Sequence, residues 1–443
     1  MALVTLGCKV NRTDSDTISG ELLGRAFDIV HDQAEAEVVV INTCTVTGEA
    51  DAKARKAVRH ALSLPLAPLV VVTGCLVAID ASGLRELSDR VVVEEDKAAV
   101  AARVAELVGE RALAPVLATP DLPRAASTTR VLLKIDNGCD NGCTYCIVPQ
   151  ARGVPRAAKA ARLTDDVRAL VAAGTKEIVL TGINIGRYRD PGMPAGASRP
   201  KTRVIDLPAL LEVLAATGIP RIRLSSIEPP DVTARFLHVA ATHPQVMPHL
   251  HIPLQSGSDR VLHAMGRAYT TADFARILRD ARAALPQLAV TTDVIVGFPG
   301  ETDMEHAESL AFVEACGFAK LHVFRYSKRP GTPAADMPGQ VDPRVKAARA
   351  AEMRALGARL AAARAALRVG GHAHVLIERA KDPDPHIAQG TSEDYLHVII
   401  AHSSARPGDL IRVRITGLVS AVGTSSPASV MAAEESSPVV ESN

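Results

Sequence analysis

The feature that most constrains this sequence is a short loop with three cysteines in the pattern CxxxCxxC, namely Cys139, Cys143 and Cys146. The loop directly follows an apolar run that predicts a buried strand. Gly138 and Gly142 lie within it, and they allow the backbone to fold closely enough for all three sulfurs to point at one centre. We call these cysteines the barrel triplet and expect them to form a single ligand face.

Thiolates at this spacing bind soft metals, chiefly zinc or iron–sulfur clusters. A structural zinc site needs four ligands, but the chain has no histidine between His60 and His238 and no fourth cysteine close by. An iron–sulfur cluster with one open iron accounts for the missing ligand. The alternative is three cysteines packed as small apolar groups, and a loop rich in Gly, Asn and Asp offers no core for them.

The motif and the segment after it, Ile147–Gly153, resemble the radical S-adenosylmethionine (SAM) enzymes. In those enzymes three cysteines hold a [4Fe–4S] cluster, and the amino and carboxylate groups of SAM take the fourth iron. The resemblance implies that Cys139, Cys143 and Cys146 are metal ligands and catalytic residues, and that Tyr145 packs against the cluster.

The first hundred residues alternate short apolar runs with helical patterns, which predicts a parallel sheet with helices on its faces. The expected strands are Ala2–Leu6, Glu37–Ile41, Leu69–Thr73 and Arg90–Val93, and the expected helices are Asp14–Arg25, Glu49–Leu62, Ser82–Leu87 and Lys97–Val108. We assign residues 1–113 to this N-terminal domain.

Three further cysteines, Cys8, Cys44 and Cys75, each follow the carboxyl end of an expected strand. Those ends lie along one edge of an open α/β sheet, so cysteines far apart in sequence can converge there. Any one of them alone would be read as a buried structural cysteine. The repeated placement predicts a second cluster site, and we call these residues the strand-end triplet.

The segments Gly7–Asn11, Asn42–Val46 and Thr73–Cys75 resemble the N-terminal domain of the methylthiotransferases, a family that pairs this domain with a radical SAM barrel. Its members modify an adenosine beside the tRNA anticodon or an aspartate of a ribosomal protein. Gly-Cys-Lys-Val-Asn resembles the branch that converts N6-threonylcarbamoyladenosine (t6A) at tRNA position 37 to 2-methylthio-t6A. Isopentenyladenosine in tRNA and the ribosomal aspartate remain alternative substrates, and a non-catalytic iron–sulfur protein that binds RNA is an alternative of another class.

This resemblance also implies the cofactors and partners, which are two [4Fe–4S] clusters, SAM, a tRNA, a small electron-donor protein and a sulfur donor. The cluster on the barrel triplet passes an electron to SAM, and the resulting 5′-deoxyadenosyl radical activates adenosine C2. The cluster on the strand-end triplet holds the sulfur, and a second SAM supplies the methyl group. Insertion at an unactivated C–H carbon needs such cofactors because side-chain acid–base chemistry has no adequate reagent.

From Arg130 to residue 342 a second α/β repeat predicts six strand–helix units, resembling the partial barrel of the radical SAM fold. The expected strands are Val131–Ile135, Glu177–Leu180, Arg221–Ser225, His249–Leu254, Ala289–Val296 and Ala319–Tyr326, and the expected helices are Thr164–Ala173, Leu207–Ala216, Thr233–Ala241, Thr271–Ala284 and Asp303–Cys316.

Polar residues gather just after the barrel strands, where barrel active sites lie. Besides Tyr145, the candidates for binding SAM and substrate are Asn184, Glu228, Gln255, Ser256, Gly297 and Pro299. Each of these segments can equally be a simple turn or helix entry. Cys316 has no partner in its own segment and is expected in the core.

Two basic segments are candidates for RNA contact. The loop Gly186–Arg203 carries five Lys or Arg and one acid, and a helix at residues 343–368 carries seven basic residues and the single acid Glu352. Such cations can neutralise phosphates. They can equally line a solvated surface, with the helix held on the barrel by Leu356, Leu360 and Leu367.

The remaining segments complete the expected organisation. Residues 114–129 are predicted as a linker, and residues 369–424 as a small β-barrel resembling the RNA-binding TRAM module, with β-runs at His372–Glu378, Tyr395–Ile400 and Leu410–Leu418. Tyr395 is the only aromatic residue in that module. Residues 425–443, rich in Ser, Ala and Glu, are predicted to be disordered.

Composition adds two expectations. The 443 residues include no apolar run long enough to span a membrane and no secretory signal, so a cytoplasmic protein is expected. Lys and Arg total 50 against 49 Asp and Glu, so affinity for RNA has to come from local patches rather than from net charge.

Overall fold

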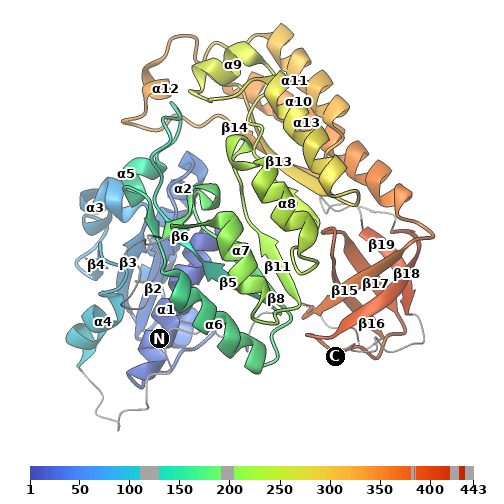
Figure 1. Cartoon of the computed structure of the whole chain (residues 1–443). Helices are drawn as coiled ribbons and strands as arrows, with labels where there is room; N and C mark the ends of the chain where they lie inside the picture. The colour runs from blue at the N-terminus through green and yellow to red at the C-terminus, as the bar shows by residue number, and fades with distance from the viewer. Residues whose placement is uncertain (110–128, 191–203, 381–383, 385, 420–428, 435–443) are drawn as a thin grey trace, which may run out of the picture.

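The computed structural model describes residues 1–109, 129–190, 204–380, 384, 386–419 and 429–434. Three bodies follow one another along the chain, an N-terminal α/β domain, an open parallel barrel and a closed C-terminal β-barrel (Figure 1). The expected α/β class with a radical SAM barrel and a small β module is confirmed. The expected linker and most of the basic loop, residues 191–203, lie outside the described residues.

The N-terminal sheet consists of four parallel strands lying side by side in chain order, β1 (Ala2–Thr5), β2 (Val38–Thr43), β3 (Leu69–Gly74) and β4 (Val91–Val93). Its helices are α1 (Lys9–Gly24), α2 (Gly48–Leu62), α3 (Val77–Arg85) and α4 (Val100–Val108), with a short 3-10 turn at Gln33–Glu35. Alternate residues of β2 and β3 pack against α1 and α4 on one face and against α2 and α3 on the other. This two-sided burial explains the unbroken apolar runs of the strands.

Helix α1 begins at Lys9, five residues before the expected start at Asp14. Its first turns bury polar side chains such as Asn11 and Ser15, so they show no apolar periodicity. Helix α3 likewise begins at Val77 rather than Ser82.

The barrel contains two half-sheets of parallel strands, in the orders β11-β8-β5 and β12-β13-β14. A bridge between Ser226 and His251 joins them, which gives six strands in all. The strands are β5 (Arg130–Lys134), β8 (Glu177–Thr181), β11 (Arg221–Leu224), β12 (His249–His251), β13 (Ala289–Val296) and β14 (Lys320–Arg325). Strand β12 is shorter than expected because Pro253 has no N–H to donate and the Leu254 N–H bonds to the Thr292 hydroxyl instead.

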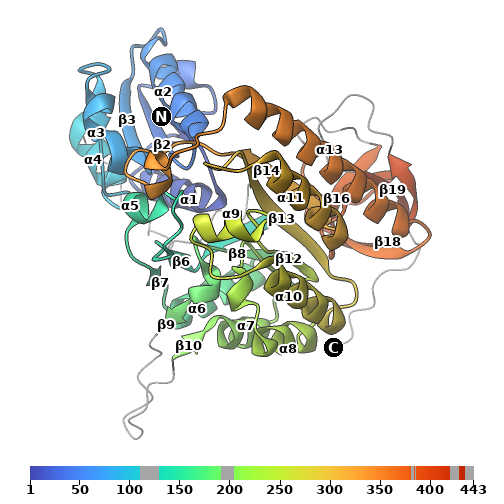
Figure 2. The same ribbon diagram turned by 90° about the horizontal axis from the view of Figure 1, so that it is seen from above.

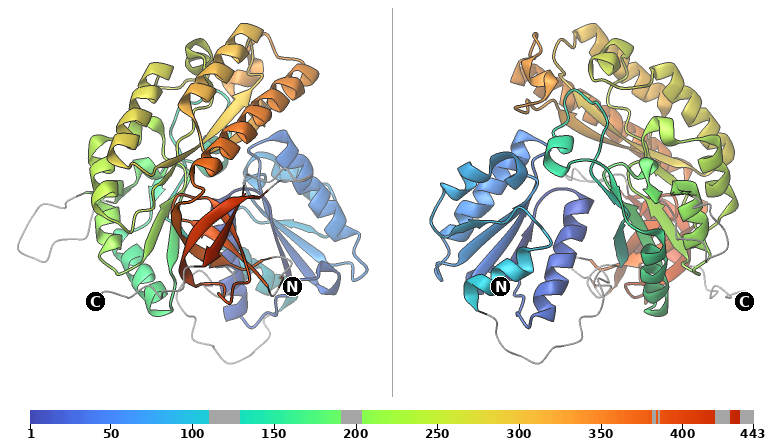
Figure 3. Two further views of the ribbon diagram at one scale, coloured as in Figure 1. Left: turned by 90° about the vertical axis from the view of Figure 1, so that its right-hand side faces the viewer. Right: turned by 60° about the vertical axis from the view of Figure 1, so that its left-hand side comes forward.

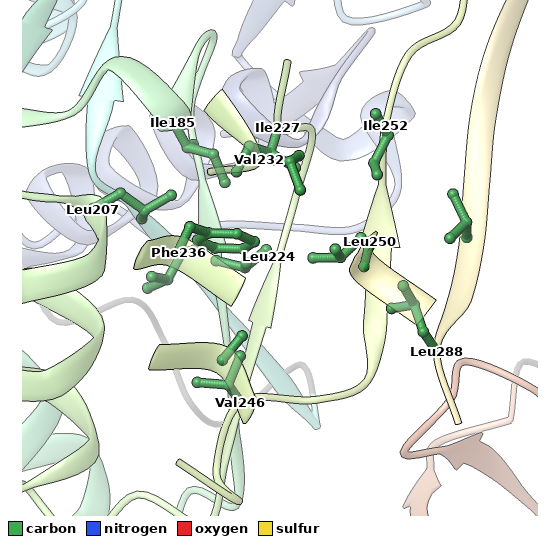
Figure 4. Close-up of a cluster of buried hydrophobic side chains, with 14 of the residues drawn as sticks. Ile185, Leu207, Leu224, Ile227, Val232, Phe236, Val246, Leu250, Ile252 and Leu288 are labelled. Carbon is green, nitrogen blue, oxygen red and sulfur yellow. The ribbon is translucent and has the colours of Figure 1, made fainter. Parts of the chain in front are cut away.

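Helices cover the outer face of this barrel, and their apolar sides form its core. Figure 4 shows Phe236 and Leu207 packed beside Leu224 of β11. The covering helices are α6 (Ala160–Ala172), α7 (Leu207–Ala215), α8 (Ala234–Thr242), α10 (Thr271–Ala284) and α11 (Asp303–Cys316). The shorter elements are β6 (Asp136–Asn137), α5 (Val148–Arg152), β7 (Arg156–Ala157), β9 (Arg189–Asp190), β10 (Ile205–Asp206), α9 (Asp259–Ala264), α12 (Pro333–Asp336) and 3-10 turns at Ile185–Arg187 and Pro229–Asp231.

Helix α13 (Pro343–Leu367) runs across the molecule and ends beside the C-terminal barrel (Figures 2 and 3). Met353 and Leu356 are buried in the barrel core, whereas Leu367 is 86% exposed, so its expected packing role is wrong. Four of the seven basic residues of this segment pair with the protein's own acids. These pairs are Arg349 with Glu301 and Asp303, Arg359 with Glu314, Arg364 with Asp394, and Arg368 with Glu393 and Asp394.

The C-terminal module is a closed barrel of five strands in the order β15-β16-β17-β19-β18. Its strands are β15 (His372–Glu378), β16 (Ile387–Ser392), β17 (His397–Ala401), β18 (Leu410–Val419) and β19 (Ser429–Glu434). Strand β19 corrects the prediction of a disordered tail after residue 424, because Val430 and Ala432 enter the core and the strand pairs with both β17 and β18. The strand was missed because the Ser- and Ala-rich composition of the tail favoured disorder over the short alternation of buried and partly exposed residues in β19.

This module closes the amino-terminal end of the barrel strands. Arg221 donates to the His374 carbonyl at 2.7 Å, and the Arg223 guanidinium pairs with Glu177 at 2.8 Å in a buried position. The Tyr395 ring is stacked on His249, with ring centroids 4.1 Å apart. Tyr395 is therefore committed to the interface between the two barrels.

Candidate functional site

The loop of the barrel triplet is held by backbone hydrogen bonds from several sides. The Cys139 N–H donates to the Gly153 carbonyl at 3.1 Å, and the Thr144 N–H donates to the Met265 carbonyl at 3.0 Å. Gly266 has a positive φ of 71°, and a Cβ there would lie 2.7 Å from the Gly142 carbonyl oxygen. The turn after α9 can approach the cysteine loop this closely only because residue 266 is glycine.

Arg267, in that same turn, contacts the barrel triplet directly. Its guanidinium donates to the Cys143 sulfur at 3.2 Å and also hydrogen bonds to the Glu228 carboxylate. The Arg267 side chain is only 3% exposed. Glu228, a predicted cofactor contact, thus lies near Cys143 through Arg267, whereas Arg267 was missed because no motif surrounds it.

Burial favours the neutral thiol at two cysteines of this loop when no metal is bound. It raises the pKa of Cys146 to about 12 and also raises the pKa of Cys139. All seven cysteines are free of disulfides. Metal ligation has to replace these protons, so loading of the site releases protons and depends on pH.

Asn184 is buried beyond the end of β8, and neither its amide oxygen nor its amide nitrogen has a partner among the described residues. Its backbone N–H donates to the Asp136 carboxylate at 3.0 Å. Buried amides are nearly always hydrogen bonded, so this orphaned pair fits a ligand with polar groups of its own, as SAM has. Asn184 is the predicted cofactor contact that the geometry supports best.

The other predicted contacts have mixed outcomes. Tyr145 packs beside the apolar cluster of Phe298 and Tyr326, and burial raises its pKa well above the usual value. Gln255 has a φ of 68°, a conformation that is strained for a residue other than glycine. Such strain is concentrated at functional sites.

Ser256, Gly297 and Pro299 are all buried, and the first two have structural contacts. The Ser256 hydroxyl lies 3.3 Å from that of Ser309 in α11. The Gly297 N–H donates to the Glu301 carboxylate at 2.6 Å, which is the contact of a turn. The structure thus favours the turn interpretation for Ser256 and Gly297. Cys316 is buried in the barrel core, as expected.

The strand-end triplet lies at the carboxyl ends of three neighbouring parallel strands, β1, β2 and β3. Cys44 and Cys75 are 5% exposed, and Cys8 is exposed at the start of α1. Gly7 has a φ of 102°, and a Cβ there would lie 2.8 Å from the Cys44 sulfur. Burial raises the pKa of Cys44, and the neighbouring Cys75 and Cys8 raise it further. The convergence predicted from the strand ends is therefore found in the structure.

Arg152 links the two cysteine sets. It ends the short helix α5, six residues after Cys146, and its guanidinium hydrogen bonds to Asn11 of α1 and to Asn137. Burial opposes the charge of Arg152, but Cys75 is the first of the groups that raise its pKa. One buried cation thus lies between the barrel loop and the strand-end triplet.

Neither triplet is preformed for a single ion. Among the described residues, no three His, Cys, Asp or Glu side chains converge closely enough to hold one metal ion. A zinc site would need ligands about 2.0–2.3 Å from the metal. A cluster of four irons and four sulfides is larger, so its thiolate ligands stand further apart, and two sets of three free thiols fit that group.

Asp136 should make the stability of the protein depend on pH. The residue is 5% exposed, and burial raises its pKa to about 6. An acid whose pKa is raised in the folded state holds its proton more tightly there, so stability falls as pH rises from about 4 to about 6 and is constant above that range. The change is about 3 kcal/mol, since one pKa unit corresponds to about 1.4 kcal/mol.

We expect Asp136→Asn to remove this dependence. The check is the difference in thermal midpoint between the wild-type and variant apoproteins, followed from pH 4 to pH 7 in identical buffers. A difference that does not change across that range would contradict the assigned environment of Asp136.

Family models agree with this arrangement. A three-cysteine loop after the first strand of a partial barrel defines the radical SAM class, and the model of the Radical SAM superfamily matches residues 133–313. The model of Uncharacterized protein family UPF0004 matches residues 1–94, the part with the strand-end triplet.

Similarity to three curated relatives identifies the family to which the chain belongs. The threonylcarbamoyladenosine tRNA methylthiotransferase MtaB of Bacillus subtilis is 36% identical over 94% of this chain and 93% of its own length. MtaB of Thermotoga maritima is 35% identical over 76% of this chain and 77% of its own length. The tRNA-2-methylthio-N(6)-dimethylallyladenosine synthase of Acidothermus cellulolyticus is 36% identical over 93% of this chain and 84% of its own length. The chain therefore belongs to the radical SAM methylthiotransferase family, and with that family it shares SAM and two [4Fe–4S] clusters as cofactors.

Among solved structures, the radical SAM methyltransferase TsrM from Kitasatospora setae has a TM-score of 0.53 at 16% identity, covering 75% of this chain and 76% of its own. This likeness supports the fold. No helix in the described part of the chain is long and apolar enough to cross a membrane.

Proposed function

We propose that this protein is a tRNA methylthiotransferase that converts t6A to 2-methylthio-t6A. The observation that carries the reaction class is the pairing of two separate cysteine triplets, with Arg152 beside the strand-end triplet and hydrogen bonded to Asn137, two residues before Cys139. Relatives named for t6A and for dimethylallyladenosine match equally well in identity, so the substrate has to be argued from this chain's own residues.

In this proposal the barrel triplet holds the cluster that binds SAM, and the strand-end triplet holds the cluster that carries the sulfur. When bound, the first cluster and SAM supply the one-electron chemistry needed to activate a C–H bond. Arg267 donates to the Cys143 sulfur and fixes Glu228, and hydrogen bonds to cluster sulfurs tune the potential of such sites. The Asn184 amide is available to the polar groups of SAM.

Arg152 and its neighbours keep the two sets at a fixed separation. Its guanidinium lies 3.5 Å from the Asp14 carboxylate of α1, which also pairs with Lys97 and Lys134. This buried network joins the N-terminal domain to β5 of the barrel. Positioning matters here because a substrate carbon has to meet groups from both domains.

Lys9 supports t6A as the substrate. It is the first residue of α1, and its ammonium lies among charged groups of the other two bodies. Burial lowers the pKa of Lys9, Tyr395 opposes this, and Arg130 and Arg223 lower it further. Arg130 is paired with Glu378 and Arg223 with Glu177, whereas Lys9 has no ion-pair partner among the described residues, so Lys9 is the cation that can meet an anionic group.

Lys9 also acts on His322 of β14. Burial lowers the pKa of His322 to about 4, Asp293 opposes this, and Lys320 and Lys9 are among the groups that lower it further. The threonylcarbamoyl group of t6A carries a carboxylate, whereas an isopentenyl group carries no charge. The ammonium of Lys9 therefore suits t6A better than isopentenyladenosine.

The test compares anticodon stem-loops that carry t6A or isopentenyladenosine, with the reconstituted holoenzyme. Wild type should methylthiolate the t6A substrate with the higher kcat/KM. Lys9→Met should lower kcat/KM for t6A about 10- to 150-fold, the loss expected for one hydrogen bond to a charged group of about 1.5–3 kcal/mol. Lys9→Arg keeps the charge and serves as the control. Preference for isopentenyladenosine by wild type would contradict the substrate assignment.

The proposed reaction on tRNA also leads to proposals for the compartment, the electron donor and the sulfur donor. We infer a cytoplasmic protein that receives electrons from a small redox protein and sulfur from a separate donor, since the chain has cysteines for two clusters and no further cysteine outside its core.

A further inference from the structure

A hollow of about 900 Å³ lies between the N-terminal domain and the barrel. Its walls come from α2, from β14 and the residues after it, and from the first turns of α13, which lie near one another in Figure 2. At one end it reaches Gly7 and Cys44 of the strand-end triplet. We call this hollow the α2–β14 groove.

The walls of the groove are fixed to each other by polar contacts between the domains. The Gly48 N–H donates to the Ser327 hydroxyl at 2.9 Å. Arg329 pairs with Asp51 at 2.7 Å and donates to the Thr45 hydroxyl at 2.7 Å. The groove is therefore a built feature of the domain interface, and Thr45 ties its position to Cys44.

Positive charge dominates the lining. The groove is lined by five cations and by a single carboxylate, Glu49, which is paired with Arg325. The cations are Lys53, Arg325, Lys328, Lys346 and Arg354.

Three of these cations are free to bind a ligand. Lys53, Lys328 and Arg354 are exposed and have no carboxylate partner in the described part of the chain. Arg354 comes from α13, and its position contrasts with the four basic residues of that helix segment that are paired within the protein. An anion in the groove would relieve the repulsion among these charges.

An exposed aromatic ring lies in the same groove. Phe324 of β14 is 42% exposed and lines the wall between Val323 and Arg325. The chain has seven Phe and five Tyr, all within the described ranges, and Phe324 alone among them is exposed. An exposed ring among cations can stack on a planar partner such as a base.

We propose that the α2–β14 groove binds the single-stranded RNA next to the target adenosine, with Phe324 stacked on a base and with Lys53, Lys328 and Arg354 on phosphates. Alternating aromatic and cationic groups are the usual means of binding single strands. Because the groove ends at Cys44, a strand held there would lead to the sulfur-bearing site. The inference rests on the proposed tRNA function and adds to it the residues that hold the anticodon loop.

The test measures binding of a t6A anticodon stem-loop to the reconstituted holoenzyme at several salt concentrations. The triple variant Lys53→Ala/Lys328→Ala/Arg354→Ala should lower the slope of log affinity against log salt by about 2, since each single-strand phosphate contact contributes about 0.7. A triple variant at exposed cations outside the groove, Lys56→Ala/Arg59→Ala/Arg279→Ala, makes the same charge change and should leave the slope near wild type.

Phe324→Ala should weaken binding about 5- to 150-fold, the range for loss of one stacked base, without changing the salt slope. Phe324→Tyr should restore affinity because it keeps the ring. Iron content and SAM cleavage in the absence of RNA should be unchanged in all these variants, which shows that they fold and load their clusters.

The outcomes separate this inference from the proposed function. If wild type binds and modifies the stem-loop while both the groove triple variant and Phe324→Ala bind as wild type does, the groove is not the RNA site and the function stands. An equal loss in the control triple variant would mean a general charge effect and would also overturn the inference. A wild-type holoenzyme that binds no tRNA stem-loop would overturn the proposed function itself.

Discussion

Cys143→Ala should abolish both SAM cleavage and methylthiolation, whereas Cys44→Ala should abolish methylthiolation and leave 5′-deoxyadenosine formation detectable. The reason is that the two triplets belong to separate domains with separate cores. Cys143 lies in the barrel loop beside Arg267 and Glu228, and Cys44 follows β2 of the N-terminal sheet. Loss of one ligand set should therefore leave the other loaded.

Iron content gives the matching measurement. Anaerobic reconstitution should give about eight irons per chain in wild type and about four in either variant. Cys316→Ala is the control, because Cys316 is buried in the barrel core away from both triplets, and it should keep the full iron content. If Cys44→Ala eliminated SAM cleavage while the barrel cluster remained intact, the assignment of SAM cleavage to the barrel triplet alone would be wrong.

Arg267→Met should destabilise the barrel and weaken its cluster site together. The Arg267 side chain is 3% exposed, and its removal leaves the Glu228 carboxylate without its cation. Breaking a buried ion pair in this way costs about 3 kcal/mol. Burial already raises the pKa of Glu228 and Arg267 opposes that rise, so the variant should lose most stability at neutral pH and less in acid.

A double variant separates the two effects. Arg267→Met/Glu228→Gln removes the unpaired charge, so the thermal midpoint should return toward wild type, while the reduction potential of the barrel cluster should stay shifted because the donor to the Cys143 sulfur is still missing. Arg267→Lys keeps a cation beside Glu228, so its thermal midpoint should lie between those of wild type and Arg267→Met. A potential equal to wild type in Arg267→Met would show that this hydrogen bond does not act on the cluster.

Both triplets could be predicted from sequence because each follows a strong local pattern. The barrel triplet is contiguous, and the strand-end triplet uses the rule that parallel strands end at one edge. Glu228 and Asn184 could be named as candidates for the same reason, since polar residues after barrel strands face one end.

Contacts that depend on remote segments could not be predicted. Arg267 reaches Cys143 from 124 positions further along the chain, and Arg152 reaches Asn11 from 141 positions away. No spacing in the sequence encodes either approach. The ion pairs of α13 could not be predicted for a similar reason, because the acidic partners come from other elements.

Composition alone does not show what an aromatic residue contacts. Tyr395 is the one aromatic residue of the C-terminal module, and in the structure its ring stacks on His249. The exposed ring is Phe324, in a strand where an apolar residue is expected to be buried. Only the three-dimensional arrangement shows which of these rings is free.

The central claim, that this chain adds a methylthio group to t6A in tRNA, is tested most directly by nucleoside analysis of tRNA from cells that lack the protein. The account predicts that 2-methylthio-t6A disappears, that t6A accumulates in its place, and that expression of the wild-type chain, but not of the Cys143→Ala variant, restores the modification. If 2-methylthio-t6A persisted in those cells while the methylthio derivative of isopentenyladenosine disappeared, the claim would be contradicted.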